Sequence, residues 1–165
     1  MREAFADQTD PAFLQEALSQ INSYRAQHGA PPLTLDPQLV EYAKSRAAKM
    51  SAAGQISHDG LDRQQYGENA AWQATSTPGT PGAAAGATSD WYSEVDNFNF
   101  TSPEGPHSGV VGHFTAMVWK SSTKVGIGRV AGQGAEYYET FIVANFSPPG
   151  NMRGSFAANV SPKQG

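Results

Sequence analysis

The chain contains no cysteine among its 165 residues, and this absence excludes both disulfide bonds and thiol chemistry. Charged side chains are also scarce, at 16% of residues, and the net charge is −4. No run of basic residues occurs, and nucleic-acid binding draws on clustered Lys and Arg, so we expect no nucleic-acid partner. The longest apolar stretches, such as residues 141–144, are too short to cross a bilayer. We therefore expect no transmembrane segment.

The N-terminus lacks the features of a secretory leader and of a lipid anchor. The charged residues Arg2, Glu3 and Asp7 follow Met1, where a leader would continue into an apolar segment. N-myristoylation requires Gly at the second position, which is Arg2 here. The net negative charge also gives no support for direct binding to acidic lipid surfaces.

The composition that remains indicates one folded domain over residues 1–165. Hydrophobic residues make up 39% and aromatic residues 10% of the chain, whereas disordered sequences usually have few aromatics and much charge. The 17 Gly and 11 Pro indicate long ordered loops. We expect short tails at residues 1–9 and 161–165.

Helix signals fill the first third of the chain. Asp10-Pro11 and Asp36-Pro37 each combine an N-cap residue with Pro at the first helical position. Apolar residues then recur with helical spacing until His28-Gly29 and Gly54, respectively. A third helix is expected to begin near Asp90. The apolar positions of these three helices are Leu14, Ala17, Leu18, Ile21 and Tyr24; Leu39, Ala43, Ala47 and Met50; and Trp91, Val95 and Phe98.

The remaining segments predict loops and a β-hairpin. Residues 74–89 are rich in Gly, Pro, Ala and Thr without periodicity, so we expect a flexible loop there, and a second loop follows at 101–112. Residues 124–130 and 140–146 are β-rich runs around a Gly-rich turn. Helices followed by an antiparallel hairpin predict an α+β fold in which helices cover the sheet.

Five short motifs occur along the chain: Ser57-His58, Gly67-Glu68-Asn69, Trp91-Tyr92-Ser93-Glu94, the GHFTAMVWKSS segment 112–122 and the FIVANFSPPGNM segment 141–152. In this order they resemble the motifs of the CAP family, which comprises cysteine-rich secretory proteins, antigen 5 and pathogenesis-related group-one proteins. Asn22 and Arg25 fit a further HNxxR pattern of this family, although Ile21 stands where His is usual. The second CAP signature is altered at Ala144 and Phe146, where the family usually has Cys and Tyr.

The resemblance implies a three-layer α-β-α sandwich with a central antiparallel sheet. The missing cysteines make the sequence similar to the branch of the Golgi-associated plant pathogenesis-related proteins, or to bacterial and fungal relatives. The family resemblance favours a secreted, extracellular protein. The absence of cysteine leaves an intracellular or Golgi-associated, membrane-peripheral location as the alternative.

The resemblance also implies a surface cleft in which two His and two Glu converge, at His58, Glu68, Glu94 and His113. The spacing of Glu94 supports its place there independently. Glu94 follows Trp91 by three residues and precedes Phe98 by four, so it lies on an apolar helix face. A carboxylate on such a face needs a partner or water.

Three roles for these four residues remain open. His58 and His113 can bind Zn²⁺ or another divalent cation, with a carboxylate or water completing the shell, although no dense motif such as HExxH occurs. His and Glu can instead form an acid–base pair in hydrolysis, but no nucleophile motif occurs and Ser57 points away from His58 in an extended segment. The third role is a polar cleft floor that receives a ligand.

The favoured hypothesis is a non-catalytic binding protein for a lipid or sterol-type ligand. Asn69, Trp72 and Trp91 are the candidate residues of its pocket, and the loop 74–89 is a candidate gate. The first alternative is a protein-interaction or host-defence module, including a homodimer. The second, less favoured, is a metal-dependent hydrolase or protease.

Overall fold

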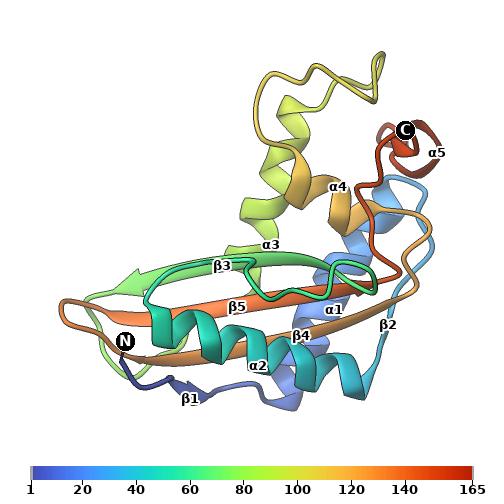
Figure 1. Cartoon of the computed structure of the whole chain (residues 1–165). Coiled ribbons are helices and arrows are strands. Elements are labelled where there is room, and N and C mark those ends of the chain that lie inside the picture. Colours follow the sequence, from blue (N-terminus) through green and yellow to red (C-terminus); the bar gives the residue numbers. More distant parts are fainter. Residues whose placement is uncertain (1, 165) are drawn as a thin grey trace.

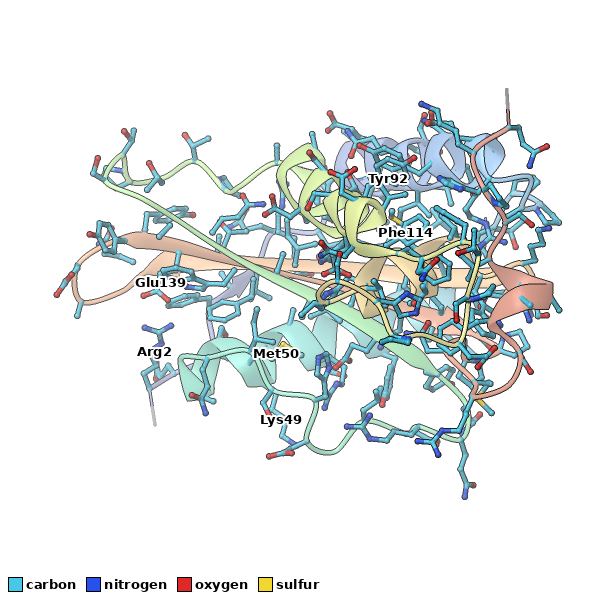
Figure 2. The ribbon with its side chains drawn as sticks, turned by 90° about the horizontal axis from the view of Figure 1, so that it is seen from above. Arg2, Lys49, Met50, Tyr92, Phe114 and Glu139 are labelled. Atoms are coloured by element: carbon cyan, nitrogen blue, oxygen red, sulfur yellow. The ribbon has the colours of Figure 1, made fainter. Side chains whose placement is uncertain are left out.

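The computed structural model describes residues 2–164, which form three layers with the sheet in the middle (Figure 1). Seen from above, Tyr92 and Phe114 lie on one side of the sheet, and Lys49 and Met50 lie on the other (Figure 2). The α+β class and the three-layer arrangement are thereby confirmed. The elements in chain order are β1 (Ala6–Asp7), α1 (Pro11–Gln27), β2 (Thr34–Leu35), α2 (Pro37–Ala53), β3 (Gly67–Thr75), α3 (Ala84–Ser93), the 3-10 helix η1 (Glu94–Asn97), α4 (Gly112–Val118), β4 (Lys124–Gln133), β5 (Tyr138–Ser147) and α5 (Phe156–Asn159).

The sheet is built around the long hairpin of β4 and β5. Its order is β1-β4-β5-β3, with antiparallel pairing throughout this path, and β2 pairs in parallel with the start of β4. The hairpin was predicted, but β3 and the two-residue strands β1 and β2 were not. The expected N-terminal tail contains β1, where Ala6 pairs with Ala131.

The first two helices begin where their capping signals predict. The side chain of Asp10 accepts a hydrogen bond from the backbone N–H of Phe13, and that of Asp36 accepts one from Gln38. Helix α2 ends on Gly54, which has a left-handed φ of 75°, a conformation that glycine adopts without steric cost.

The segment 74–89 differs from the expected loop. Strand β3 continues through Thr75, and α3 begins at Ala84 rather than near Asp90. Ala84 and Ala87 are buried, because their small side chains let α3 pack closely against α1. The Ala-rich composition that resembled a loop is therefore a helix with high intrinsic propensity and a small-residue contact face. Only residues 76–83 connect the two elements.

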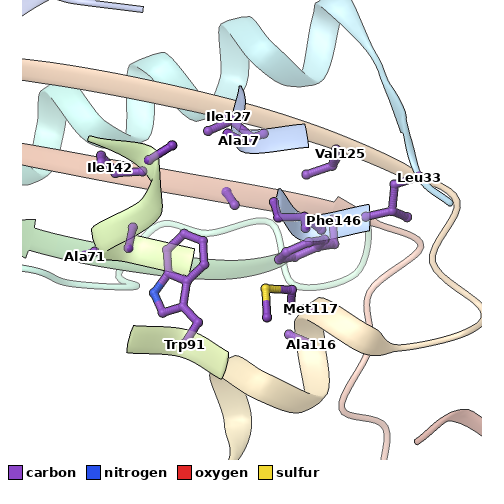
Figure 3. Close-up of a cluster of buried hydrophobic side chains, with 14 of the residues drawn as sticks. Ala17, Leu33, Ala71, Trp91, Ala116, Met117, Val125, Ile127, Ile142 and Phe146 are labelled. Atoms are coloured by element: carbon purple, nitrogen blue, oxygen red, sulfur yellow. The ribbon is translucent and has the colours of Figure 1, made fainter. Parts of the chain in front are cut away.

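The apolar core lies on both faces of the sheet because successive residues of β5 alternate between them. On the α2 side, Phe141 and Val143 pack with Ala43, Ala47 and Met50 of α2. On the opposite side, a larger cluster joins the sheet to α1, α3 and α4 (Figure 3). It includes Ile21, Trp91, Met117, Ile142 and Phe146.

The edge strand β3 follows the same alternation, and this positions the candidate site. Ala70 belongs to the cluster on the α2 side, whereas Ala71 belongs to the opposite one. Glu68 therefore faces α2, and Asn69 faces α4.

Within residues 2–164, no helix is both long and apolar enough to span a membrane.

Candidate functional site

A cavity of about 430 Å³ opens beside the first residues of β3. It is bounded by the loop before β3, the start of α4 and the loop after β5. His58, Glu68 and His113 all line it. The other lining residues are Leu61, Arg63, Tyr66, Gly67, Asn69, Gly112, Pro149, Gly150, Asn151 and Met152.

His58 and Glu68 form the half of the site that faces α2. The Nδ1 atom of His58 lies 2.8 Å from Oε1 of Glu68. Arg46 of α2 binds the same carboxylate through two hydrogen bonds of 2.7 and 2.8 Å, and Asn145 of β5 donates to it at 3.0 Å. The Glu68 side chain is fully buried, whereas that of His58 is 37% exposed.

Burial raises the pKa of Glu68, but the hydrogen bonds from Arg46, His58 and Asn145 outweigh it and lower the pKa to about 2. Glu68 is therefore ionised at neutral pH and only accepts hydrogen bonds. It follows that Nδ1 of His58 carries the proton of this contact. The Nε2 atom, on the far side of the ring, is left for the cavity.

Glu94 and His113 form the half of the site on the opposite face of the sheet. Oε1 of Glu94 accepts the backbone N–H groups of His113 and Phe114 at 2.8 and 3.1 Å. Its Oε2 lies 2.6 Å from Nδ1 of His113. Glu94 thus fixes both the first turn of α4 and the orientation of the imidazole. A carboxylate on an apolar helix face needs a partner, and for Glu94 that partner is His113.

The two pairs present the same arrangement from opposite sides of β3. In each, a carboxylate holds Nδ1 of an imidazole, and the imidazole lines the cavity. Glu94 does not line the cavity itself and acts from behind His113. The four residues therefore lie at one site. Each imidazole is held in position by the carboxylate that binds its Nδ1 atom.

This arrangement limits which atoms can hold a metal ion. The carboxylate of Glu68 is occupied by three side chains, and that of Glu94 by two backbone N–H groups and an imidazole. Accordingly, the described residues contain no group of three or more His, Cys, Asp or Glu placed to hold a metal ion. His58 and His113 remain as a pair of nitrogen donors, each oriented by a carboxylate as metal-bound histidines commonly are. A cation held by this pair would draw its remaining ligands from water.

Of the three pocket candidates, only Asn69 lines the cavity. Its amide donates to the carbonyl oxygen of His113 at 2.9 Å and so ties β3 to α4. Trp91 is buried in the core, where its indole N–H donates to the carbonyl of Ala70. Trp72 is 47% exposed and lines a separate shallow hollow with Ile56. Neither tryptophan is placed to contact a ligand in the cavity.

Sequence reasoning missed several residues that build the site. Arg46 lies three residues after Ala43 and four before Met50, so a charge on the apolar face of α2 was a visible signal. Asn151, with a φ of 58°, accepts from Thr115 and donates to the carbonyl of Gly112, which fixes the loop after β5 against α4. Asn151 lies within the motif at 141–152, but that motif assigns it no separate role in the site.

Comparison with known proteins agrees with this geometry. The model of the CAP family, described as the cysteine-rich secretory protein family, matches residues 18–146. The chain is 39% identical over 153 residues to human Golgi-associated plant pathogenesis-related protein 1, covering 91% of this chain and 93% of that one. It is 35% identical to the secreted protein RBT4 of Candida albicans over 92% of this chain, which spans only 39% of that protein. The chain therefore belongs to the CAP family.

Solved structures of low sequence identity share the fold. The structure of BmVAL-1 superposes with a TM-score of 0.70 at 20% identity, covering 98% of this chain and 85% of that one. The structure described as NaASP2 with Zn²⁺ gives a TM-score of 0.63 at 21% identity, covering 94% and 87% of the two chains. The layered packing is thus retained where most side chains differ.

Proposed function

We propose that this CAP domain is a non-catalytic binding protein whose cavity holds a divalent cation through His58 and His113 and receives a lipid or sterol-type ligand. The observation that carries the proposal is the pair of imidazoles that line one cavity while a carboxylate holds Nδ1 of each. A relative crystallised with Zn²⁺ supports zinc as the first cation to test. A bound cation would supply a positive centre for a polar group of the ligand.

The cavity lining suits an amphipathic ligand. Its volume of about 430 Å³ lies in the range of small-molecule sites. Leu61, Tyr66, Pro149 and Met152 contribute apolar surface, whereas the imidazoles and Asn69 contribute polar atoms. We expect the polar head of a ligand to lie against the imidazoles and its apolar part against Leu61 and Met152.

Isothermal titration calorimetry with Zn²⁺ tests the cation site. One ion is expected to bind the native chain at pH 7.5, and His58→Ala and His113→Ala are each expected to weaken binding at least about tenfold, because each removes one of two nitrogen donors. His107→Ala is the matched control, since His107 lies outside the cavity. Unchanged binding in the double variant His58→Ala/His113→Ala would remove the cation from the proposal.

A filter assay with labelled cholesterol and a labelled fatty acid tests the ligand class. Saturable binding of either is expected, with a loss of affinity in Met152→Asp, which places a charge on the apolar part of the lining. The absence of saturable binding of both ligands would contradict the lipid assignment and leave the cation site to be judged by calorimetry.

A protein-interaction module is the second candidate, and one observation favours it. Ile56 and Trp72 are 40% and 47% exposed and line the same hollow, away from the cavity. Exposed aromatic and aliphatic side chains of this kind are enriched at protein interfaces. Sedimentation analysis separates the candidates: a dimer lost in Trp72→Ser would favour interaction, and a monomer in both chains would favour ligand binding alone.

Hydrolysis receives less support from the site. Within the described residues, the cavity lining contains no Ser or Thr hydroxyl, and Ser57 is not part of it. Glu68 is ionised, so it cannot act as a general acid at neutral pH. Peptide or ester hydrolysis that is present in the native chain and absent from Glu94→Ala/His113→Ala would revive this function.

A further inference from the structure

The charged groups around the cavity leave one positive charge without a negative partner. The carboxylate of Glu68 is neutralised by Arg46, and both side chains are buried at the back of the cavity wall. The carboxylate of Glu94 lies behind His113 and does not line the cavity. Glu68 is therefore the one carboxylate among the described lining residues, and Arg46 offsets its charge.

Arg63 supplies the charge that remains. It is exposed, it lines the cavity, and it forms neither a salt bridge nor a side-chain hydrogen bond with any residue in the described part of the chain. Several other cations of this chain do have carboxylate partners, as Arg2 has Glu139 and Lys44 has Glu41. In a chain of net charge −4, a guanidinium without such a partner therefore lines the cavity.

The chemistry of this side chain defines its complement. A guanidinium presents N–H donors in a planar fork that matches a carboxylate or phosphate group with two parallel hydrogen bonds. In the metal-free cavity, Nε2 of His58 presents a lone pair and not a donor, so the attraction for such a group comes from Arg63, and a bound cation would add to it. A neutral head group gains neither contribution.

We infer that the cavity selects ligands that carry an anionic group, a carboxylate or a phosphate, and that Arg63 is the specificity-determining residue that binds it. The inference rests on the proposed binding function, because it names the ligand class of the same cavity. The group can belong to an amphiphile or to a free anion, and both have the same chemistry toward Arg63.

Three amphiphiles with the same eight-carbon chain test the selection: octyl phosphate, octanol and octylamine, titrated into the metal-free protein by calorimetry at low salt. Octyl phosphate is expected to bind about two- to fivefold more tightly than octanol, and octylamine most weakly, since ion pairs of exposed groups have effects of this size. The preference is expected to shrink with added NaCl. In Arg63→Gln, octyl phosphate and octanol are expected to bind alike.

Arg153→Gln is the matched control, because Arg153 is equally exposed, has no ion pair among the described residues and does not line the cavity. This variant is expected to keep the preference. Inorganic phosphate that competes with octyl phosphate would identify a free anion as a sufficient ligand. Failure to compete, with selection intact, would assign the group to an amphiphile.

Two results would contradict the binding of an anionic group by Arg63, and both differ from the result expected if the cavity binds no lipid at all. Equal affinity for the three amphiphiles contradicts anion selection, and a preference that persists in Arg63→Gln contradicts its assignment to Arg63. Both results leave lipid binding in place. Absence of binding by all three amphiphiles and by phosphate contradicts both anion selection and the proposed ligand class.

Discussion

Glu68 and Glu94 are both paired with a histidine, yet the residues around them give them different tasks. Glu68 is fully buried and needs Arg46 and Asn145 in addition to His58, because an isolated buried carboxylate would be very costly. Glu94 keeps 15% exposure and accepts backbone N–H groups at the start of α4. The carboxylate of Glu68 therefore joins the sheet to α2, and that of Glu94 accepts the free N–H groups in the first turn of α4.

The lowered pKa of Glu68 predicts a dependence of stability on pH. The folded value of about 2 lies below the ordinary value of 4.5, so the stabilisation is complete above about pH 5 and is lost as the pH falls toward 2. It corresponds to about 3 kcal/mol, an upper limit for this group. Urea unfolding at a series of pH values measures it.

Glu68→Gln serves as the comparison for this measurement. The variant is expected to be less stable than the native chain at pH 7 and to lose less stability between pH 5 and pH 2. If both chains follow parallel curves across this range, Glu68 is not held ionised by its partners.

At the scale of elements, helix α2 lies directly on the backbone of β4. A Cβ atom placed on Gly126 would lie 2.1 Å from the carbonyl carbon of Leu39, and one on Gly128 would lie 2.6 Å from the backbone nitrogen of Lys44. Glycine within a strand marks such a close approach. This contact holds α2, and with it Arg46, at the distance that Glu68 requires.

Gly126→Ala is therefore expected to destabilise the fold by at least about 1–3 kcal/mol, since helix and strand must separate to admit the methyl group. Ser45→Ala, on the exposed side of the same helix, is expected to change stability by less than about 0.5 kcal/mol. Chemical denaturation of the two variants measures both effects. Equal stability of Gly126→Ala and the native chain would show that α2 can shift without cost.

The elements that the sequence predicted well are those with local signals. Helices α1 and α2 have Asp-Pro starts and apolar periodicity, and the β4–β5 hairpin has β-rich runs around a turn. Strand β3 and the start of α3 were missed because small residues such as Ala70, Ala71 and Ala84 carry no distinct period. The four site residues could be assigned from motifs. Which carboxylate binds which imidazole depends on long-range packing, which the motifs do not describe.

At the scale of the whole molecule, Arg25 provides a long-range tie in a chain that has no disulfide. This fully buried guanidinium donates to the carbonyl oxygens of Pro31, Met117, Trp119 and Ser122. Burial lowers its pKa to about 10, so it stays charged at neutral pH. Two segments far apart in the sequence, residues 25–31 and 117–122, are thereby joined through one side chain.

Arg25→Ala is expected to lower the free energy of unfolding by at least about 3 kcal/mol, because it leaves several buried carbonyl groups without donors. Arg153→Ala, which removes an exposed arginine, is expected to change it by less than about 0.5 kcal/mol. Thermal and urea unfolding measure both variants. A loss of similar size in the two would show that the buried tie contributes nothing specific.

The proposed cation site requires that His58 and His113, which approach from opposite faces of the edge strand β3, turn their Nε2 atoms toward one point. Anomalous diffraction from crystals grown with Zn²⁺ measures this directly. The predicted result is a single zinc peak about 2.0–2.1 Å from Nε2 of both histidines, with Glu68 and Glu94 still bound to Nδ1. Zinc on only one of the histidines, or coordinated by Glu68, would contradict the claim.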